Sequence, residues 1–566
     1  MRDLLIGHRR SGGPRPWRAA GIGAGLCGAA AVVAWFIFER SVTYEPPGGQ
    51  VSGTVSWQGK STGLGREALA FRDARLTWRG GIAVLHVQGT GHEIGAGHGR
   101  LLGPAVDEAV LAAKPSLDAI AQGKGLWARL THDLRVDWRL RFLDDGLSDS
   151  DRSVIAGMMR GAGPGDERYQ DMVRAQAVWD LGKPTEASDG TGLTRSLAVV
   201  AAQESAVTNR VWVGHAFSAP GLSDGGEALR PVLTLARPQG GLAWASVGWP
   251  GNAGVVAGVN AKGLVILVNP ARTREVRPTR SARPTLLLAR SVLEQASTLD
   301  EAVRTLENTA TLGAAAYLVV DGRAGKWAVV ERGPSRAQLT RGSSPLVLGD
   351  SLTSAAFSAD PENDRTRRLA PTAARVARVL QLVRAPLPAV DSLAAALRDR
   401  RAGDAARVPG HRGVPFDPAA QVVIIDPGLM VLWVADPEAA GRMRAFDLRH
   451  ELEGVGDSPA PPPDLPADPS LEPEQLGHLV LARRELRAAR RAMARGELAT
   501  ARELADRALA RAPHLPEALE LAGRLAGAAG DHAAARWLLQ LWLDGGADDP
   551  DREQKVRSLL TTDRGF

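Results

Sequence analysis

A hydroxyl side chain that could attack an acyl carbon stands at the head of a predicted strand. Thr194 precedes the apolar run 196–203, and a turn at Thr208-Asn209 separates this run from a second one over 211–217. Two such runs joined by a turn are typical of a β-hairpin. A hydroxyl residue that becomes the first residue of a cut chain can use its own α-amine as the base. The sequence therefore predicts a nucleophile at Thr194, with Ser196 as a weaker substitute.

Three other hydroxyl residues stand in patterns open to similar chemistry. Thr191, in the same polar loop, is a weak substitute for Thr194. Ser351 lies in Gly-Asp-Ser-Leu, which resembles the nucleophile block of a class of serine esterases and keeps a serine esterase open as a minor alternative. Ser223 fits a nucleophile-elbow pattern, but that elbow needs a helix directly after it, and the glycines and Pro231 that follow predict a hairpin loop.

Metal and nucleotide chemistry have little support in the sequence. The stretch 89–100 is rich in glycine, but its spacing is G-x-G-x-x-x-G and not the dinucleotide-binding G-x-G-x-x-G. His92 and His98 lack a visible third ligand, so we interpret them as residues of a turn or helix start. The single cysteine, Cys27, leaves no Cys-based site after it. We therefore expect neither a metal nor a cofactor.

The net charge of +6 is concentrated at the start of the chain. Before Ala19 there are five arginines and one aspartate, and the remaining sequence mixes both signs without a basic stripe. Proteins that bind nucleic acid usually carry such a stripe or patch. A nucleic-acid partner is therefore not expected.

Residues 19–38 form an uncharged, apolar run of twenty residues. As a helix, this length spans a bilayer core of roughly 30 Å. The basic segment 1–18 before it is expected in the cytoplasm by the positive-inside bias. The sequence therefore predicts a single-pass protein of the inner or plasma membrane whose later domains lie outside the cytoplasm. A cleaved signal peptide is the alternative.

The rest of the chain alternates pairs of predicted strands with pairs of predicted helices. This alternation indicates an α+β fold of stacked α and β layers, not a parallel βαβ fold. Strands are expected over 81–88, 196–203, 211–217, 232–236, 241–247, 253–259, 264–269, 315–320, 327–331, 421–425 and 430–435, with helices over much of 100–185 and over 284–296, 299–308 and 365–384. The predicted organisation is a tether over 39–80, a main domain over 81–453, an extended Pro-rich linker over 454–473 and a helical tail over 474–566.

The helical tail contains an internal repeat. Gly496-Glu-Leu-Ala-Thr-Ala501 recurs as Gly530-Asp-His-Ala-Ala-Ala535, an offset of 34 residues. This is the tetratricopeptide period. Because fewer than three such repeats are marginal alone, we expect them to cap themselves or to pack on the main domain. A protein partner bound through 474–566 and a plain helical stack without a partner are both left open.

Residues from about 80 to 450 resemble the isopenicillin-N acyltransferase-like (acyl-coenzyme A:6-aminopenicillanic-acid acyltransferase) family of N-terminal-nucleophile hydrolases. The order and spacing of several short segments carry this resemblance. The segments are Gly91–Leu102, Thr194–Val200, Val213–Ser218, Gly258–Asn269, Pro284–Leu293, Thr298–Leu306, Asp321–Glu331 and Arg365–Leu369. The resemblance implies a four-layer αββα domain and a self-cleaving amide hydrolase or acyltransferase.

The resemblance also implies roles for particular residues. Thr194-Arg195-Ser196 stands where the family has Cys-Thr/Ser-Ser, so Thr194 is the implied nucleophile. Asn260, in Gly-x-Asn-x-x-Gly-Leu, is retained and is the implied oxyanion or amine-positioning donor. Arg195, His215 and Ser218 are the implied substrate contacts.

Two further family motifs have changed in this sequence. His215-Ala216-Phe217-Ser218 stands where the family has Arg-Asn-x-Asp. Ser354-Ala355-Ala356 stands where it has a Thr-Asn-His-like run. Alanine side chains cannot hold a substrate by hydrogen bonds. The active site is therefore expected to be degraded relative to the family.

Two hypotheses of function follow. The first is a membrane-anchored amide hydrolase or acyltransferase that acts on a small N-acyl or peptide-like substrate through Thr194. The second is a catalytically inactive relative that binds a ligand outside the cytoplasm and contacts a partner through the helical tail. Cleavage of the chain before Thr194 separates them, because the first hypothesis requires a free α-amine at that residue.

Overall fold

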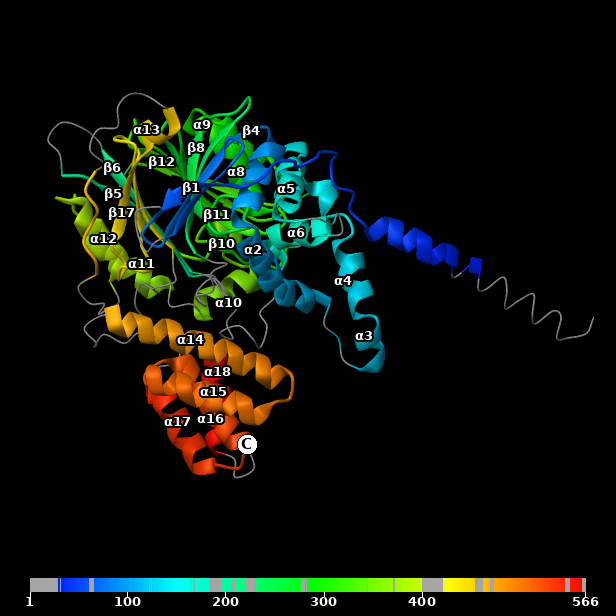
Figure 1. Cartoon of the computed structure of the whole chain (residues 1–566). Helices are drawn as coiled ribbons and strands as arrows, with labels where there is room; N and C mark the ends of the chain where they lie inside the picture. The colour runs from blue at the N-terminus through cyan, green and yellow to red at the C-terminus, as the bar shows by residue number, and fades with distance from the viewer. Residues whose placement is uncertain are drawn as a thin grey trace, which may run out of the picture.

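A computed structural model describes the chain except for residues 1–28, 31, 61–65, 122, 124, 164, 166–167, 183–194, 205–209, 219–229, 276–279, 281, 344, 370–371, 400–420, 454–461, 469–472, 545–549 and 562–566. Two antiparallel-rich sheets form the body of the protein, with helices on their outer faces (Figure 1). The predicted mixed α and β fold with C-terminal helices is thereby confirmed.

The larger sheet has eleven strands in the order β1-β2-β3-β4-β7-β8-β9-β10-β11-β12-β13. Its neighbours pair antiparallel except β4 and β7, which pair parallel. The strands are β1 (Ser56–Lys60), β2 (Glu67–Phe71), β3 (Ala74–Arg79), β4 (Ile82–Gly89), β7 (Val232–Pro238), β8 (Trp244–Gly248), β9 (Ala257–Asn260), β10 (Leu264–Ala271), β11 (Ala314–Asp321), β12 (Lys326–Arg332) and β13 (Ala337–Gly342).

The smaller sheet has six strands in the order β14-β5-β6-β15-β16-β17, all antiparallel to their neighbours. The predicted hairpin after Thr194 is its β5–β6 pair. The strands are β14 (Leu346–Leu348), β5 (Arg195–Ala202), β6 (Val211–Ser218), β15 (Gln421–Asp426), β16 (Val431–Ala435) and β17 (Met443–Asp447).

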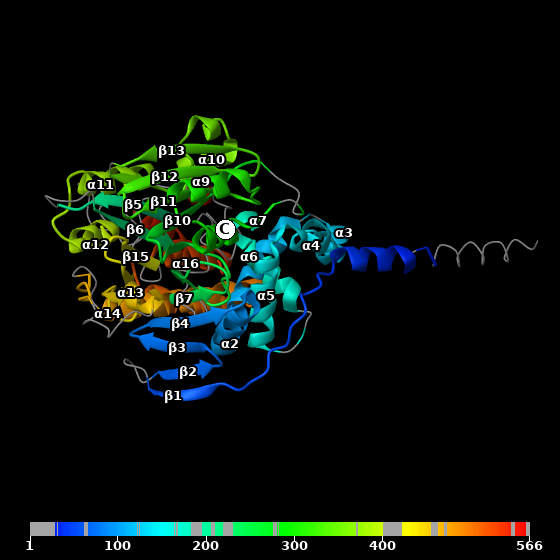
Figure 2. The ribbon, with the colours of Figure 1, turned by 90° about the horizontal axis from the view of Figure 1, so that it is seen from above.

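The two sheets pack face to face over an apolar layer that both contribute to. The outer face of the larger sheet packs against α2, α5, α8 and α9, and that of the smaller sheet against α11 and α12. The layers therefore follow the order helix, sheet, sheet, helix (Figure 2). These helices are α2 (Gly91–Asp118), α5 (Asp149–Ala162), α8 (Thr285–Gln295), α9 (Leu299–Asn308), α11 (Thr372–Val383) and α12 (Val390–Arg398).

Smaller helices connect these layers. They are α3 (Leu126–Leu130), α4 (His132–Leu140), α6 (Arg168–Gln176), α7 (Val178–Leu181), α10 (Pro361–Leu369) and α13 (Leu448–Glu453).

The glycine-rich stretch in α2 serves close helix packing. A Cβ added at Gly95 would lie 2.0 Å from the backbone oxygen of Val154, and one at Gly99 would lie 2.0 Å from that of Met158. Gly157 on α5 is equally tight, at 2.1 Å from a backbone oxygen of α2. The backbones of α2 and α5 thus touch because these positions lack a side chain.

The predicted single-pass membrane location is wrong. Among the helices that the structure describes, none is long and apolar enough to cross a bilayer. The described part of the N-terminal helix covers residues 29–42 apart from Ala31, and it includes the charged Glu39 and Arg40. A span needs about 20 apolar residues. Residues 19–28 of the predicted span lie outside the described part of the chain.

The predicted tether over 39–80 is also wrong for much of its length, because β1, β2 and β3 lie within it and extend the larger sheet. Phe71 and Leu76 are buried there against the helical layer. The segment 454–473, expected to be an extended linker, packs on the smaller sheet where it is described. Leu465 and Met443 exchange two backbone hydrogen bonds, of 3.2 and 2.9 Å, and Asp464 forms an ion pair with Arg444.

The C-terminal helices form a group of their own below the body in Figure 1, with a separate apolar core. Gly496 and Gly530, which are 34 residues apart, both have positive φ, of 79° and 82°. Each lies just after a helix, where a left-handed residue ends it. The sequence repeat thus corresponds to two helical hairpins. The helices are α14 (Pro473–Ala494), α15 (Leu498–Arg511), α16 (Pro516–Ala528), α17 (His532–Asp544) and α18 (Pro550–Thr561).

Candidate functional site

The head of β5 is where the sequence predicts the nucleophile. Thr194 itself lies outside the described residues, and β5 begins at the next residue, Arg195. In the β5–β6 register Arg195 pairs with Ser218. The structure therefore brings the backbones of two predicted substrate contacts side by side. Their side chains lie outside the part that the structure describes.

Strand periodicity decides which side chains at this end face the space between the sheets. Along β5, Ala198 lies in the layer between the sheets, whereas Leu197 faces the outer helices. Ser196 therefore shares the inner face with Ala198, because side chains alternate along a strand. Ala216 packs in the outer layer with α12, so its position supplies nothing to the space between the sheets.

His215 on β6 contacts Asn269 on β10 across the two sheets. The His215 Nε2 lies 3.0 Å from Asn269 Oδ1. The Asn269 amide nitrogen donates to the backbone oxygens of Leu348 and Gly349, at 3.3 and 2.8 Å. Because the amide hydrogens are used there, Asn269 Oδ1 is the acceptor and His215 Nε2 carries a proton.

The environment of His215 keeps its ring neutral. Burial without a charged partner lowers the pKa of His215 from 6.5 to about 4. The ring stacks on Phe217, with centroids 5.9 Å apart. Phe217 in turn stacks on Trp249 at 6.2 Å and meets Trp179 edge-on at 5.9 Å. This aromatic cluster fixes the orientation of the imidazole, whose Nδ1 is then its basic nitrogen.

The Gly-Asp-Ser segment lies at the same end of the sheets. β14 ends at Leu348, which pairs with Ala198 on β5, two residues from Ser196. Ser351 follows three residues later and is mostly buried. The structure therefore brings two serines, Ser196 and Ser351, to the end of the sheets that holds the His215–Asn269 bond.

The run 354–356 is held by a carboxylate on β12. Glu331 accepts hydrogen bonds from the backbone nitrogens of Thr353 and Ser354, at 2.6 and 2.9 Å. The Ser354 hydroxyl has no hydrogen-bond partner. Glu331 thus holds the start of this changed family motif through backbone nitrogens, and these bonds do not depend on the side chains of the motif.

Asn260 does not join this site, contrary to the role expected for it. Its amide nitrogen donates to the backbone oxygens of Leu293 and Ala296, at 3.1 and 2.8 Å, at the end of α8. Asn260 is the last residue of β9, before the turn into β10, and β10 runs from Leu264 to Asn269 over roughly 16 Å at 3.3 Å per residue. Asn260 is therefore a structural residue at the other end of the strand and has no amide hydrogen left for an oxyanion.

A carboxyl group with an altered pKa lies next to the aromatic cluster. Asp180 accepts a hydrogen bond from the backbone nitrogen of Thr285 at 3.2 Å, at the start of α8. Burial raises the pKa of Asp180 to about 7. Arg272, just after β10, donates to the nearby backbone oxygen of Gly182 at 2.9 Å. Asp180 therefore titrates near neutral pH close to the candidate site.

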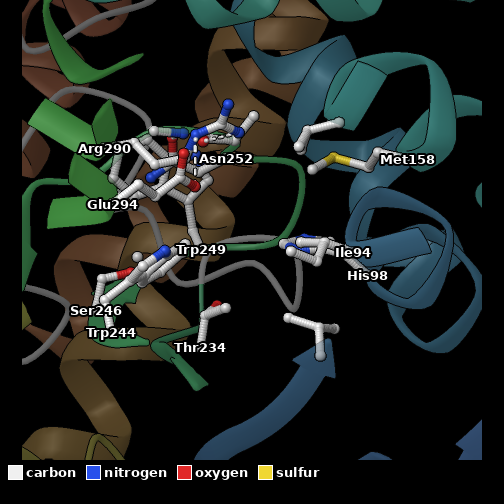
Figure 3. A pocket seen from close by; sticks show the side chains of 15 residues that line it. Ile94, His98, Met158, Thr234, Trp244, Ser246, Trp249, Asn252, Arg290 and Glu294 are labelled. Atoms are coloured by element: carbon white, nitrogen blue, oxygen red, sulfur yellow. Dashed lines mark hydrogen bonds and ion pairs between the residues drawn. The ribbon is translucent and has the colours of Figure 1, made fainter. Parts of the chain in front are cut away.

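A cavity lies on the opposite face of the larger sheet, between β8, α2 and α8 (Figure 3). Trp244, Arg290 and Glu294 line one wall, and Ile94 and Met158 lie across from them. The buried indole nitrogen of Trp244 has no hydrogen-bond partner. The cavity has a volume of about 20 Å³, which has room for one or two water molecules. It is therefore too small for an amide substrate.

Asn269 was not predicted from the sequence, and Ser196 was predicted only as a weaker substitute for Thr194. A signal for Asn269 was present, because it is a polar residue that ends the otherwise apolar run Leu264–Val268. A buried amide needs partners, and the partners come from β6 and the end of β14. No local pattern connects those three segments.

Comparisons with known proteins agree with the sequence resemblance in part of the chain. Residues 231–403 match the family described as acyl-coenzyme A:6-aminopenicillanic acid acyl-transferase. No curated protein matches the chain.

Several solved structures are similar at low identity. An N-acylethanolamine-hydrolyzing acid amidase (NAAA) ortholog from Caenorhabditis elegans is 15% identical, with 41% of this chain and 93% of that chain covered and a TM-score of 0.29. Two structures of altered conjugated bile acid hydrolase from Clostridium perfringens are each 11% identical. They cover 44% and 50% of this chain and 92% and 95% of their own, with TM-scores of 0.27 and 0.26. Such TM-scores are too low to argue for a shared activity.

The matched region runs from β7 to just past α12 and contains Asn269, the Gly-Asp-Ser segment and Ser354. The resemblance is therefore confirmed over residues 231–403, the region that matches the acyl-coenzyme A:6-aminopenicillanic acid acyl-transferase family.

Proposed function

We propose that this protein hydrolyses a small N-acyl or peptide-like amide, or transfers its acyl group, with a hydroxyl at the head of β5 as nucleophile. One observation carries this proposal. The head of β5 lies at the same end of the sheets as a neutral imidazole, His215, that is held rigidly by Asn269. The match of residues 231–403 to an acyl-transferase family supports the reaction class.

The proposed reaction begins with cleavage of the chain before Thr194. The freed α-amine accepts the proton of the Thr194 hydroxyl as its oxygen attacks the acyl carbon. The amide C–N bond breaks, and the departing amine takes the proton, which leaves an acyl ester on Thr194. Water then releases a carboxylic acid, or an acceptor amine takes the acyl group. The proton of the incoming nucleophile returns to the Thr194 oxygen.

Self-cleavage tests the Thr194 mechanism directly. The intact masses of the purified protein and the N-terminal residue of each fragment would be measured for the natural chain and for Thr194→Val. We expect a fragment that starts at Thr194 in the natural chain and a single uncut chain in the variant, because valine keeps the branched shape and removes the hydroxyl. An uncut natural chain would remove the α-amine as base.

Turnover is measured separately on a panel of N-acyl amino acids and N-acyl amides, with release of free amine as the signal. The proposed reaction class predicts amine release for at least one member and none in a boiled sample. If every member stayed intact with both cut and uncut protein, hydrolysis of small amides would be excluded.

A second candidate function is a non-catalytic module that binds an N-acyl or acidic ligand at this end of the sheets. It is favoured by the position of Asn260, whose amide is fully engaged away from the site. Calorimetric titration of the uncut chain with the same panel would then show binding without product. In either function the helical hairpins over 474–566 are proposed to contact a protein partner in tetratricopeptide manner.

A further inference from the structure

We propose, on the basis of the acyl chemistry proposed above, that Ser196, His215 and Asn269 form a hydroxyl–imidazole–amide triad in which Ser196 is the nucleophile. Such a triad would not need cleavage of the chain, because its base is a side chain and not an α-amine. It would place the nucleophile on β5, two residues after Thr194 in the sequence.

Strand pairing brings Ser196 and His215 onto one face. Ser196 pairs with Phe217, and His215 pairs with Ala198. Ser196 and His215 are therefore diagonal neighbours on adjacent antiparallel strands. Such neighbours are roughly 7–8 Å apart at the backbone, a distance that an aromatic side chain can bridge.

The Ser196 hydroxyl is a buried group that lacks a partner in the structure. Its side chain is 4% exposed, and its Oγ has no hydrogen bond. Buried hydroxyls in proteins are nearly always bonded, so an exception calls for an explanation. A nucleophile that gains its hydrogen bond only when substrate is bound is such an explanation, since catalytic hydrogen bonds often tighten only in the complex.

His215 has the tautomer that a base in this position needs. Asn269 donates to two backbone oxygens and so offers Oδ1 to His215 Nε2. A flipped amide would place Oδ1 against those two oxygens, which excludes it. The Nε2 proton is therefore fixed, and Nδ1 is left with its lone pair. An amide that orients a histidine, which in turn activates a nucleophile, follows the general logic of such triads.

The proposed step is balanced in atoms and protons. Ser196 Oγ attacks the acyl carbon while its proton moves to His215 Nδ1. The bond from the acyl carbon to its leaving group breaks, and the leaving group takes that proton. Water attacks the acyl ester in the same way, the ester bond breaks, and the proton returns to Ser196 Oγ. Asn269 keeps Nε2 in place throughout and is a positioning residue.

The experiment labels the full chain with a fluorophosphonate probe, which reacts with activated serine hydroxyls, and locates the label by peptide mass spectrometry. We expect the label on Ser196 and its loss in Ser196→Ala. His215→Gln should slow labelling by about 10²–10⁴-fold, the usual contribution of a general base. Ser291→Ala is the matched control, because Ser291 is a buried serine on α8 whose hydroxyl bonds to Leu288 O. It should label at the natural rate.

Two further measurements separate catalysis from folding. Free imidazole should restore labelling of His215→Ala, which loss of packing alone would not allow. The ¹⁵N NMR signals of His215 should report the Nε2–H tautomer in the natural chain and a mixture in Asn269→Leu. Circular dichroism of each variant shows that it has folded.

The outcomes distinguish this triad from the proposed function. Label on Thr194 or Ser351, no label at all, or labelling that ignores His215 would each overturn the triad. Amine release from the N-acyl panel would then still uphold the proposed function. If Ser196 is labelled in a way that depends on His215 but no amine is released, the triad is upheld. Its substrates would then be acyl compounds other than the amides of the panel.

Discussion

His215 on the smaller sheet and Asn269 on the larger sheet are joined by a bond of 3.0 Å between Nε2 and Oδ1. Both side chains are almost fully buried, at 1% exposure each. The bond crosses a mostly apolar layer, where a polar group without a partner is costly, and Gln421 on β15 also bonds across this layer by donating to the backbone oxygen of Gly248. The His215–Asn269 bond therefore helps to fix the relative position of the two sheets at the end where β5 begins.

Asn269→Leu should destabilise the fold by about 3 kcal/mol. The change leaves the His215 Nε2 proton and two backbone oxygens without their partner, and each such loss costs roughly 1–3 kcal/mol, with partial relief by relaxation. Urea unfolding measures the free energy. Asn308→Ala, on the exposed end of α9, is the control and should change it by less than about 0.5 kcal/mol. Equal effects of both changes would contradict a structural role for the bond between the sheets.

Gly99→Ala should be among the most damaging single-methyl additions in the chain. The new Cβ would lie 2.0 Å from the backbone oxygen of Met158, so α2 and α5 must separate. Overpacking costs about 1–3 kcal/mol, and a contact as short as this one belongs at the upper end. Thermal unfolding would show a lower Tm.

The matched change is Gly477→Ala on α14, where nothing lies within 4 Å of the added Cβ. There the methyl group should raise stability by about 0.5–1 kcal/mol, because alanine favours a helix more than glycine does. A tolerated Gly99→Ala would show that the two helix backbones do not touch.

His98→Gln should weaken the loss of stability in acid. Burial lowers the pKa of His98 from 6.5 to about 4, while the unfolded chain keeps the ordinary value. Between these pH values the unfolded state binds a proton at His98 and the folded state does not. The free energy of unfolding therefore rises with pH from 4 to 6.5. The contribution of this one residue is up to about 3 kcal/mol.

Glutamine can still accept the bond that Gly251 N donates to His98 Nε2, at 3.0 Å, but it does not titrate. Urea unfolding at pH 4.5, 5.5 and 7 compares the two proteins. We expect a flatter dependence in the variant, which still contains His86, His92 and His215, whose pKa values burial also lowers. Parallel curves would argue that His98 is solvated.

The pH dependence of stability that Asp180 contributes has the opposite sign, and Asp180→Asn should remove it. Burial raises the pKa of Asp180 from 3.8 to about 7 in the folded state, so its stabilising contribution is complete below pH 3.8 and is lost as pH rises through 7. Asparagine stays neutral and can still accept the bond from Thr285 N. The variant should therefore gain up to roughly 4 kcal/mol relative to the natural chain between pH 4 and pH 8. A constant difference across that range would contradict the raised pKa.

Much of the secondary structure could be predicted from local sequence patterns. The β5–β6 hairpin, the strand pair around the turn after Asn260 and the helices α8 and α9 lie close to where periodicity predicts them. The 34-residue repeat corresponds to two helical hairpins that turn at Gly496 and Gly530. These features depend on neighbours a few residues apart, which the sequence shows directly.

Other expectations failed because short-range patterns do not show what a segment packs against. The stretch expected as a tether forms edge strands, since Phe71 and Leu76 find a helix layer to cover them. The Pro-rich segment is docked through Leu465, which pairs with Met443 on β17. In both cases a partner distant in the sequence supplies the burial that orders the segment.

The sequence by itself predicted the hairpin of β5 and β6, the alternation of strand pairs with helix pairs and the repeat in the tail. Only the tertiary structure decided which polar residues meet. Asn260 ends β9 just before β10, and Asn269 lies near the far end of β10. Both are asparagines beside an apolar run in the sequence, yet Asn260 bonds to the backbone at the end of α8 and Asn269 holds His215. The physical reason is that contacts between sheets depend on register and on the face that each side chain takes, and both are set by pairing between strands remote in the chain.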